Sequence, residues 1–288
     1  MPAVAATVNL SQSNQAVTPS AAEARRLAAY FTPPYRPGPL PPAVDDILLR
    51  SAPVELHTAC AAMVDSWGAT ARGSARISLR ILAIAAGNAW LAYRCDSRLP
   101  RFENEYSERL AAFTAARGTL QFIDLAAPED TRATLYHVGI ANTLKLVGAE
   151  NSAALVVFAV NSSPLDGAAN HAAHDRLSEN RFVVIANSAS ATKIALALVT
   201  ARVQPGASTR EASHSATSNG EEYRAALRFG HDLAGHLTAV TAYHRDQPLG
   251  ARPRFGVIRY AWNPATRTFE VAMPVPLPPG GRRRPLAN

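Results

Sequence analysis

Cysteine and long apolar runs are scarce in this 288-residue chain, and each scarcity excludes a class of protein. Cys60 and Cys95 are the only cysteines, too few for a disulfide framework or a four-thiolate zinc site. We therefore expect two small core residues in a reducing compartment. No apolar run reaches the roughly 18–20 residues of a membrane-spanning helix. No basic segment precedes an apolar stretch at the N-terminus, so we expect neither a membrane partner nor a secretory signal.

The short motifs of common enzymes are absent as well. The chain has no Walker A loop, no Gly-x-Ser-x-Gly elbow and no Gly-x-Gly-x-x-Gly turn. Two histidine clusters, His171/His174 and His231/His236, lack the His-Glu-x-x-His spacing of zinc peptidases. We expect them to be exposed or structural, and predict no catalytic residue, no metal and no cofactor. A soluble enzyme or ligand-binding module with a histidine-based site, from a GC-rich bacterium, is the alternative.

Alanine, serine and proline are abundant instead. The chain has 57 Ala, 19 Ser and 21 Pro, together about a third of its residues. The formal net charge is +7, and lysine occurs only at Lys145 and Lys193, so nearly all basic residues are arginine. This balance favours a polyanionic partner, because a guanidinium can hold phosphate with two parallel hydrogen bonds. A GC-rich coding sequence would also raise Ala, Pro and Arg.

The distribution of proline and of apolar residues predicts three regions. Residues 1–43 form a Pro-rich arm, 44–273 an α+β core, and 274–288 a disordered tail with five prolines and a run of arginines. We expect one core domain with a mostly antiparallel sheet and flanking helices. The expected helices cover 21–30, 44–67 with a break near Pro53, 103–117, 128–146 and 221–233. The expected strands cover 77–84, 89–95, 119–125, 154–160, 181–186, 193–203 and a hairpin of 255–260 with 268–273; 205–220 is expected to be a loop.

Clustered arginines are the candidate nucleic-acid contacts. Three recur every four residues, a spacing that keeps them on one side of a helix or a strand. Others follow the next strand, precede the last hairpin or end the chain, and aromatic residues lie among them. The predicted contacts are Arg72, Arg76, Arg80, Arg94, Arg98, Arg252, Arg254, Arg282, Arg283 and Arg284. Glu105 and Arg109, spaced i, i+4, are expected to form an ion pair on a helix surface.

The arm is the candidate oligomerisation element. It is too polar and too Pro-rich to fold alone, yet Leu27, Tyr30, Phe31 and Tyr35 offer apolar anchors. We therefore expect the arm to pack on another copy, giving a homodimer or a higher polymer.

These features together resemble a viral family. The abundance of Pro, Ala and Ser, the basic charge, the size near 30 kDa, the Pro-rich arm and the absence of enzyme motifs are similar to the proline-alanine-serine-rich protein of the polymycoviruses of fungi. The resemblance implies a coat protein that covers double-stranded RNA and self-assembles on it, in the virion or the host cytoplasm. It is compositional, so it carries over no individual residue.

Overall fold

The computed structural model describes ten stretches of the chain. They are residues 15–32, 39–85, 88–103, 105–123, 125, 137–158, 178–188, 190–204, 221–247 and 252–272. The predicted tail, the loop at 205–220 and the His171/His174 cluster lie outside them. Within them the fold is mixed α+β with two antiparallel sheets and three α-helices, which confirms the predicted fold class.

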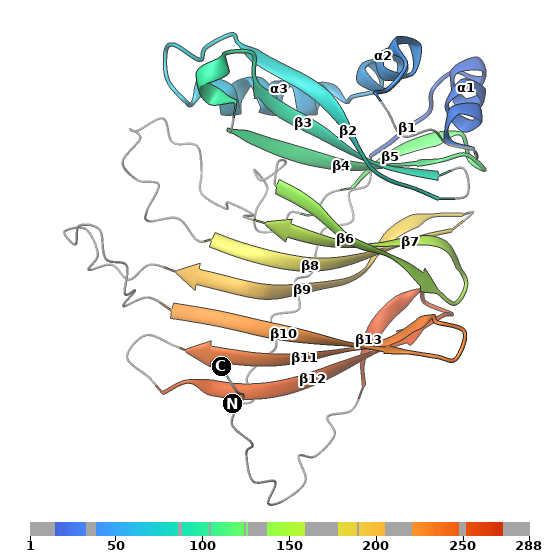
Figure 1. Ribbon diagram of the computed structural model, residues 1–288, viewed down its shortest axis with the longest axis vertical. Helices are drawn as coiled ribbons and strands as arrows, with labels where there is room; N and C mark the ends of the chain where they lie inside the picture. Colours follow the sequence, from blue (N-terminus) through green and yellow to red (C-terminus); the bar gives the residue numbers. More distant parts are fainter. Residues whose placement is uncertain are drawn as a thin grey trace, which may run out of the picture.

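A five-stranded sheet forms the N-terminal part of the molecule (Figure 1). Its order is β1-β5-β4-β3-β2, and every pairing is antiparallel. The strands are β1 (Gln15–Val17), β2 (Ala75–Ala85), β3 (Asn88–Ser97), β4 (Tyr106–Thr114) and β5 (Thr119–Ile123), with a short 3₁₀ helix, η1 (Pro100–Phe102), before β4.

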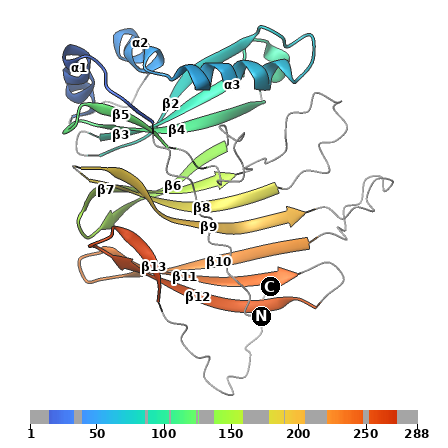
Figure 2. The same cartoon turned by 180° about the vertical axis from the view of Figure 1, so that it is seen from behind.

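Three helices cover one face of this sheet, as Figure 2 shows from behind. They are α1 (Ala21–Phe31), α2 (Pro42–Arg50) and α3 (Val54–Asp65). Ser20 begins α1 with a capping box, in which its hydroxyl accepts from the Glu23 backbone and the Glu23 carboxylate accepts from the Ser20 backbone. Pro53 separates α2 from α3, where the sequence predicts the break.

The first helix corrects the expectation for the arm. Leu27 and Phe31 are fully buried in the same chain, where Phe31 packs on Phe113 of β4 with ring centroids 5.6 Å apart. Tyr30 packs beside them. Since these anchors belong to the core of one chain, the interpretation of Leu27 and Phe31 as contacts on another copy is wrong. Tyr35 lies outside the described residues.

An eight-stranded antiparallel sheet forms the C-terminal part, and its strands follow one another in space as in sequence. The pairing of β9 with β10 covers only four residue pairs, from Glu221–Gln204 to Arg224–Ala201. Beyond it the strands separate, and Phe229 of β10 reaches Phe182 of β8. The strands are β6 (His137–Leu146), β7 (Ala149–Phe158), β8 (Ser178–Asn187), β9 (Thr192–Gln204), β10 (Glu221–His231), β11 (Leu237–Gln247), β12 (Arg254–Asn263) and β13 (Thr268–Ala272).

Two apolar layers hold the sheets together. The first lies between the five-stranded sheet and strands β6–β9, where Trp90 and Leu110 meet Leu155 and Val183. The second lies on the other face of β6–β9, where Phe182 and other residues meet Tyr260 from the last four strands. Burial of these residues is the main stabilising contribution to the stack. Helices, the five-stranded sheet and the strands from β6 to β12 therefore follow one another along the long axis (Figure 1).

Three predicted helices are strands in the structure. Segment 103–117 contains β4, the described part of 128–146 is β6, and 221–233 contains β10. β4 is buried on both faces, with Leu110 in the first layer and Phe113 under the helices, so its sequence lacks the polar alternation of a half-exposed strand. The i, i+4 helix pair of Glu105 and Arg109 is therefore wrong.

Among the described helices, none alone has the length and apolar composition to cross a membrane. The pair α2 and α3 passes that test together, with a bend of 91° between them.

Candidate nucleic-acid interface

The outer face of β10–β12 brings arginines from three strands together. The strand pairing places Arg224 beside Arg245, and Arg228 beside Thr241, which in turn lies beside Arg259. Cα partners in adjacent strands share one face of a sheet, and so do alternate residues along a strand. We call this surface the arginine face; it comprises Arg224, Arg228, Tyr243, Arg245, Phe255, Val257 and Arg259.

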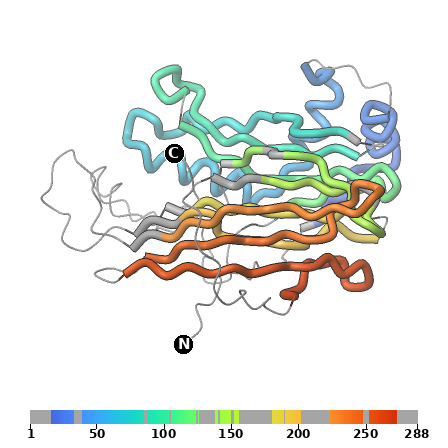
Figure 3. Tube along the Cα trace, turned by 60° about the horizontal axis from the view of Figure 1, so that its bottom comes forward, coloured from blue at the N-terminus to red at the C-terminus, as the bar shows by residue number. Residues whose placement is uncertain are grey.

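The arginine face is exposed because the opposite face of the same strands packs in the core. Ala242 and Tyr260 are buried in the second apolar layer. Because side chains alternate between faces, their neighbours Thr241, Tyr243 and Arg259 must point away from the core. All residues of the arginine face are exposed to solvent. Figure 3 shows β10–β12, in orange and red, at the side of the molecule away from the blue helices.

The arginine face has positive charge without intervening acid. From Arg224 to Arg228, from Thr241 to Arg245 and from Phe255 to Arg259, the residues on this face are arginine, alanine, threonine, tyrosine, phenylalanine and valine. Arg224 and Arg228 are about 13 Å apart along the strand, and Arg228 lies about 10 Å from Arg259 across two strands. A backbone separation of about 13 Å corresponds to roughly four nucleotides of one strand, at an axial rise of about 3.4 Å each.

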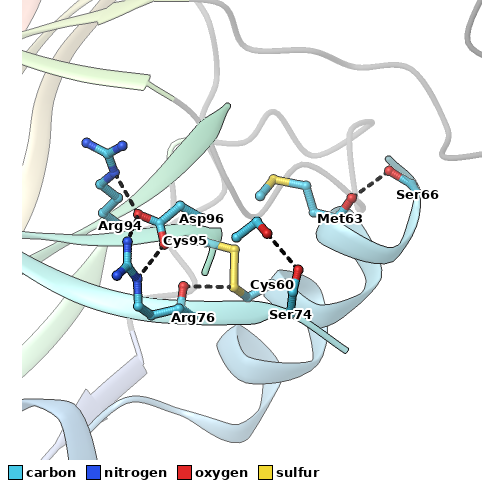
Figure 4. The surroundings of a disulfide bond; sticks show 9 residues. Cys60, Met63, Ser66, Ser74, Arg76, Arg94, Cys95 and Asp96 are labelled. Atoms are coloured by element: carbon cyan, nitrogen blue, oxygen red, sulfur yellow. Dashed lines mark hydrogen bonds and ion pairs between the residues drawn. A yellow bond between two sulfur atoms is a disulfide. The ribbon is translucent and has the colours of Figure 1, made fainter. Parts of the chain in front are cut away.

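The arginines predicted on β2 and β3 have carboxylate partners. Arg76 and Arg94 converge on the buried Asp96 carboxylate beside Cys95, as Figure 4 shows. The distances are 2.8 Å from Arg76 Nε to Oδ1 and 3.1 Å from Arg94 Nε to Oδ2. The hydrogen bond with Asp96 raises the pKa of Arg76, and the carboxylate charge adds to this. The guanidinium of Arg94 also lies 4.0 Å from the centre of the Tyr106 ring.

Arg80 joins the two sheets. It lies on the same face of β2 as Arg76, as the spacing predicts, and its Nη2 donates to Glu108 Oε1 at 2.7 Å. The same nitrogen donates to the backbone carbonyl of Val138 on β6 at 2.8 Å. Glu108 also accepts from the Val138 backbone N–H at 3.0 Å. Arg80 therefore has a structural role, and its role as a nucleic-acid contact remains a prediction.

The remaining predicted arginines are divided between exposed positions and undescribed ones. Arg72 lies in the turn before β2 and not on the strand, and Arg98 follows β3; both are exposed. Arg252 and Arg254 are exposed at the start of β12, next to the arginine face. Arg282–Arg284 lie outside the described residues.

The geometry of the described residues does not support the alternative of a histidine-based site. His231 is exposed at the end of β10. His236 Nδ1 lies 2.9 Å from Asp232 Oδ2, and Asp232 also accepts the backbone N–H groups of Ala234 and His236. These hydrogen bonds, first that from the His236 backbone, lower the pKa of Asp232. They shape the β10–β11 turn. Within the described ranges no three His, Cys, Asp or Glu residues lie close enough to hold a metal ion.

The cysteines require a correction. Cys60 on α3 and Cys95 on β3 are buried as expected, but they form a disulfide with a Cα–Cα distance of 5.5 Å, drawn in Figure 4. The expectation of two separate thiols is wrong. Since disulfides persist mainly in oxidising environments, the low cysteine count no longer argues for a reducing compartment.

Sequence reasoning missed most of the arginine face. The sequence predicts a helix over 221–233, so it does not place Arg224 and Arg228 on a sheet face, and it predicts no strand where β11 lies. The available signal was alternation. In 241–245, Thr, Tyr and Arg alternate with Ala242 and His244, and the latter two are buried.

Comparisons of the chain with protein-family models, with curated proteins and with solved structures found no match. The compositional resemblance to the polymycovirus proteins therefore stays a prediction, and the functional argument depends on the geometry of the arginine face.

Proposed function

We propose that this protein binds double-stranded RNA without reading its sequence and associates with further copies along the duplex as a coat. The observation that carries the proposal is the arginine face: four exposed arginines on three adjacent strands, with no acidic side chain between them. Each arginine that replaces a counterion at a phosphate contributes to affinity through counterion release. The net charge of +7 supports the same class of partner.

The position of the face on the surface of a sheet favours backbone contacts over base readout. The major groove of A-form RNA is deep and narrow, and its minor groove is wide and shallow. Side chains on a sheet surface meet the phosphates along that shallow groove and do not reach the base edges of the deep one. Binding through phosphates alone positions a protein without specifying sequence. A coat needs this property, since it covers every sequence of a genome.

Substitutions that remove positive charge from the face test the proposal. We expect the triple variant Arg228→Gln, Arg245→Gln, Arg259→Gln to bind two unrelated RNA duplexes about 100-fold more weakly near 0.1 M salt. The slope of log affinity against log salt should become shallower by about two to three units. Gel shifts with both duplexes at several salt concentrations measure both effects.

A matched control removes the same charge elsewhere. Arg25, Arg26 and Arg50 are exposed on α1 and α2, far from β12 in Figure 1. Replacement of all three by Gln should reduce affinity much less than the variant of the face. Equal losses in both triple variants, or strong preference of the native protein for one duplex, would contradict the proposed contact surface.

The self-association part of the proposal has its own test. Because Leu27 and Phe31 belong to the core of one chain, deletion of the whole arm would damage the fold and is a poor probe. Light scattering of the full chain, alone and with a long duplex, should give masses above one copy and a saturating ratio of protein to RNA length. A monomer that never places more than one copy on a long duplex would refute coating.

A further inference from the structure

The arginine face exposes aromatic rings that phosphate binding does not use. The side chains of Tyr243, Phe255 and Val257 are 46%, 64% and 39% exposed. They are three of the eight large exposed hydrophobic residues in the described part of the chain, and all three lie on the same face of β11 and β12. Rings bury 150–250 Å² each in cores and interfaces, so two rings with this exposure among arginines mark a surface that a ligand covers.

We infer that the arginine face binds unpaired nucleotides, whose bases stack on Tyr243 and Phe255 while the neighbouring arginines hold their phosphates. This inference rests on the proposed function, because it assigns a second nucleic-acid form to the same face. It adds one ligand class, which is single-stranded nucleic acid. It also adds two residues, Tyr243 and Phe255, whose rings stack on the faces of bases.

The strand register gives each ring a cationic neighbour. Phe255 lies directly opposite Arg245, and Tyr243 lies opposite Val257. Tyr243 and Arg245 are alternate residues of one strand, so Arg245 is an immediate neighbour of both rings on the sheet surface. Diagonal neighbours in an antiparallel pair are about 7–8 Å apart, which places Tyr243 and Phe255 at that separation. Two bases that have left their stack can lie on rings so spaced, with the phosphate between them near Arg245.

An intact duplex cannot use the rings in this way. Its bases are stacked on one another, and only its edges and backbone are accessible to a flat surface. Unpaired bases have free faces, and stacking on an aromatic side chain tolerates any base. The arginines therefore serve both forms of nucleic acid, whereas the two rings contribute to the single-stranded form only.

Charge argues against a second copy of this chain as the occupant. Two identical faces would bring eight arginines together, a like-charge contact that costs free energy. An anionic lipid surface shares the phosphate chemistry but offers no planar base to the rings. We therefore assign the face to single-stranded nucleic acid and use anionic vesicles as a competing ligand in the test.

Replacement of the rings by threonine, which retains strand propensity, separates base stacking from charge. We expect Tyr243→Thr and Phe255→Thr each to weaken binding of a labelled 12-nucleotide single-stranded RNA about ten-fold in fluorescence anisotropy. Binding of a duplex of equal length should change less than two-fold. Tyr243→Phe should keep the native affinity, and an abasic oligonucleotide of the same length should bind native protein and threonine variants equally.

Each other outcome has a distinct meaning. Loss of single-strand and duplex binding to the same extent in folded threonine variants, or no loss of either, would overturn base stacking and leave the proposed function standing. If the native protein binds neither RNA form, the proposed function fails together with this inference. Phosphatidylserine vesicles that bind with the same dependence on Tyr243 and Phe255, and compete with the oligonucleotide, would reassign the face to membranes. Thermal melting of each variant verifies that the fold is retained.

Discussion

His244 is a buried side chain packed among the last strands. It is buried on the inner face of β11, stacked on Tyr223 with ring centres 5.9 Å apart, and its Nδ1 has no hydrogen-bond partner among the described residues. On its other side lies Gly256, where even a methyl group would run into the imidazole. Burial lowers the pKa of His244, and the nearby Asp246 carboxylate opposes that shift only in part.

This pKa gives a signed prediction. The unfolded chain takes up a proton at His244 near pH 6.5, whereas the folded protein does so only at lower pH. The unfolded state therefore binds more protons below pH 6.5, and stability should fall as the pH falls through this range. Urea midpoints at pH 7.5, 6.0 and 5.0 measure the fall. It should be smaller in His244→Phe, and an identical fall in both proteins would show that other groups cause it.

At the scale of elements, the disulfide ties α3 to β3 across a sequence separation of 35 residues. Closing a loop of that length restricts the unfolded chain, and the usual relation gives a contribution of about 3–4 kcal/mol. We expect Cys60→Ala with Cys95→Ala to lower the free energy of unfolding by about that amount, measured by urea denaturation. The native protein in strong reductant should approach the variant. If the urea midpoint of the native protein does not change when the disulfide is completely reduced, this contribution is contradicted.

The contact of β2, β4 and β6 at Glu108 gives a second prediction at this scale. Its carboxylate accepts from Arg80 and from the Val138 backbone in a buried site. Removal of a buried partner leaves the other groups uncompensated, so Glu108→Ala should cost about 3–5 kcal/mol of stability. Arg80→Gln should cost less, because that side chain is half exposed and water can replace it. Chemical denaturation of both variants decides the order, and an equal or reversed order would contradict it.

The elements also show how far sequence reasoning extends. β2, β8 and β9 were predictable because Ile, Val and Leu dominate them, and α1 and the break at Pro53 follow from capping and proline. β4, β6 and β10 were predicted as helices, because alanine, leucine and charged residues carry high helix propensity there. Pairing with neighbouring strands overrides that propensity. Segment 221–231 forms a strand whose register, and therefore whose arginine face, depends on β11.

At the scale of the whole molecule, composition shows that the chain is basic but not where its positive charge gathers. Arg76, Arg80 and Arg94, which the sequence grouped with the exposed arginines, face carboxylates of Asp96 and Glu108. No spacing rule reveals the partners of Arg76 and Arg80, because Asp96 and Glu108 lie 20 and 28 residues away on strands that only the fold brings together. Arg94, in contrast, contacts Asp96 two residues along its own strand. The arginine face likewise required the pairing of three strands. The α+β class needed only the mixture of helices and hairpins.

The sequential order of the eight-stranded sheet has a consequence for how the chain acquires its structure. Every pairing in this sheet joins two strands that are consecutive in the sequence, from β6 with β7 to β12 with β13. Such local pairings close with little loop entropy, and topologies rich in them fold faster than those that join distant strands. The four-pair junction of β9 with β10 is the shortest link in this series of long hairpins. During synthesis on the ribosome, strands β6–β9 would thus pair and pack on the finished five-stranded sheet before β10 emerges. The arginine face would then form last.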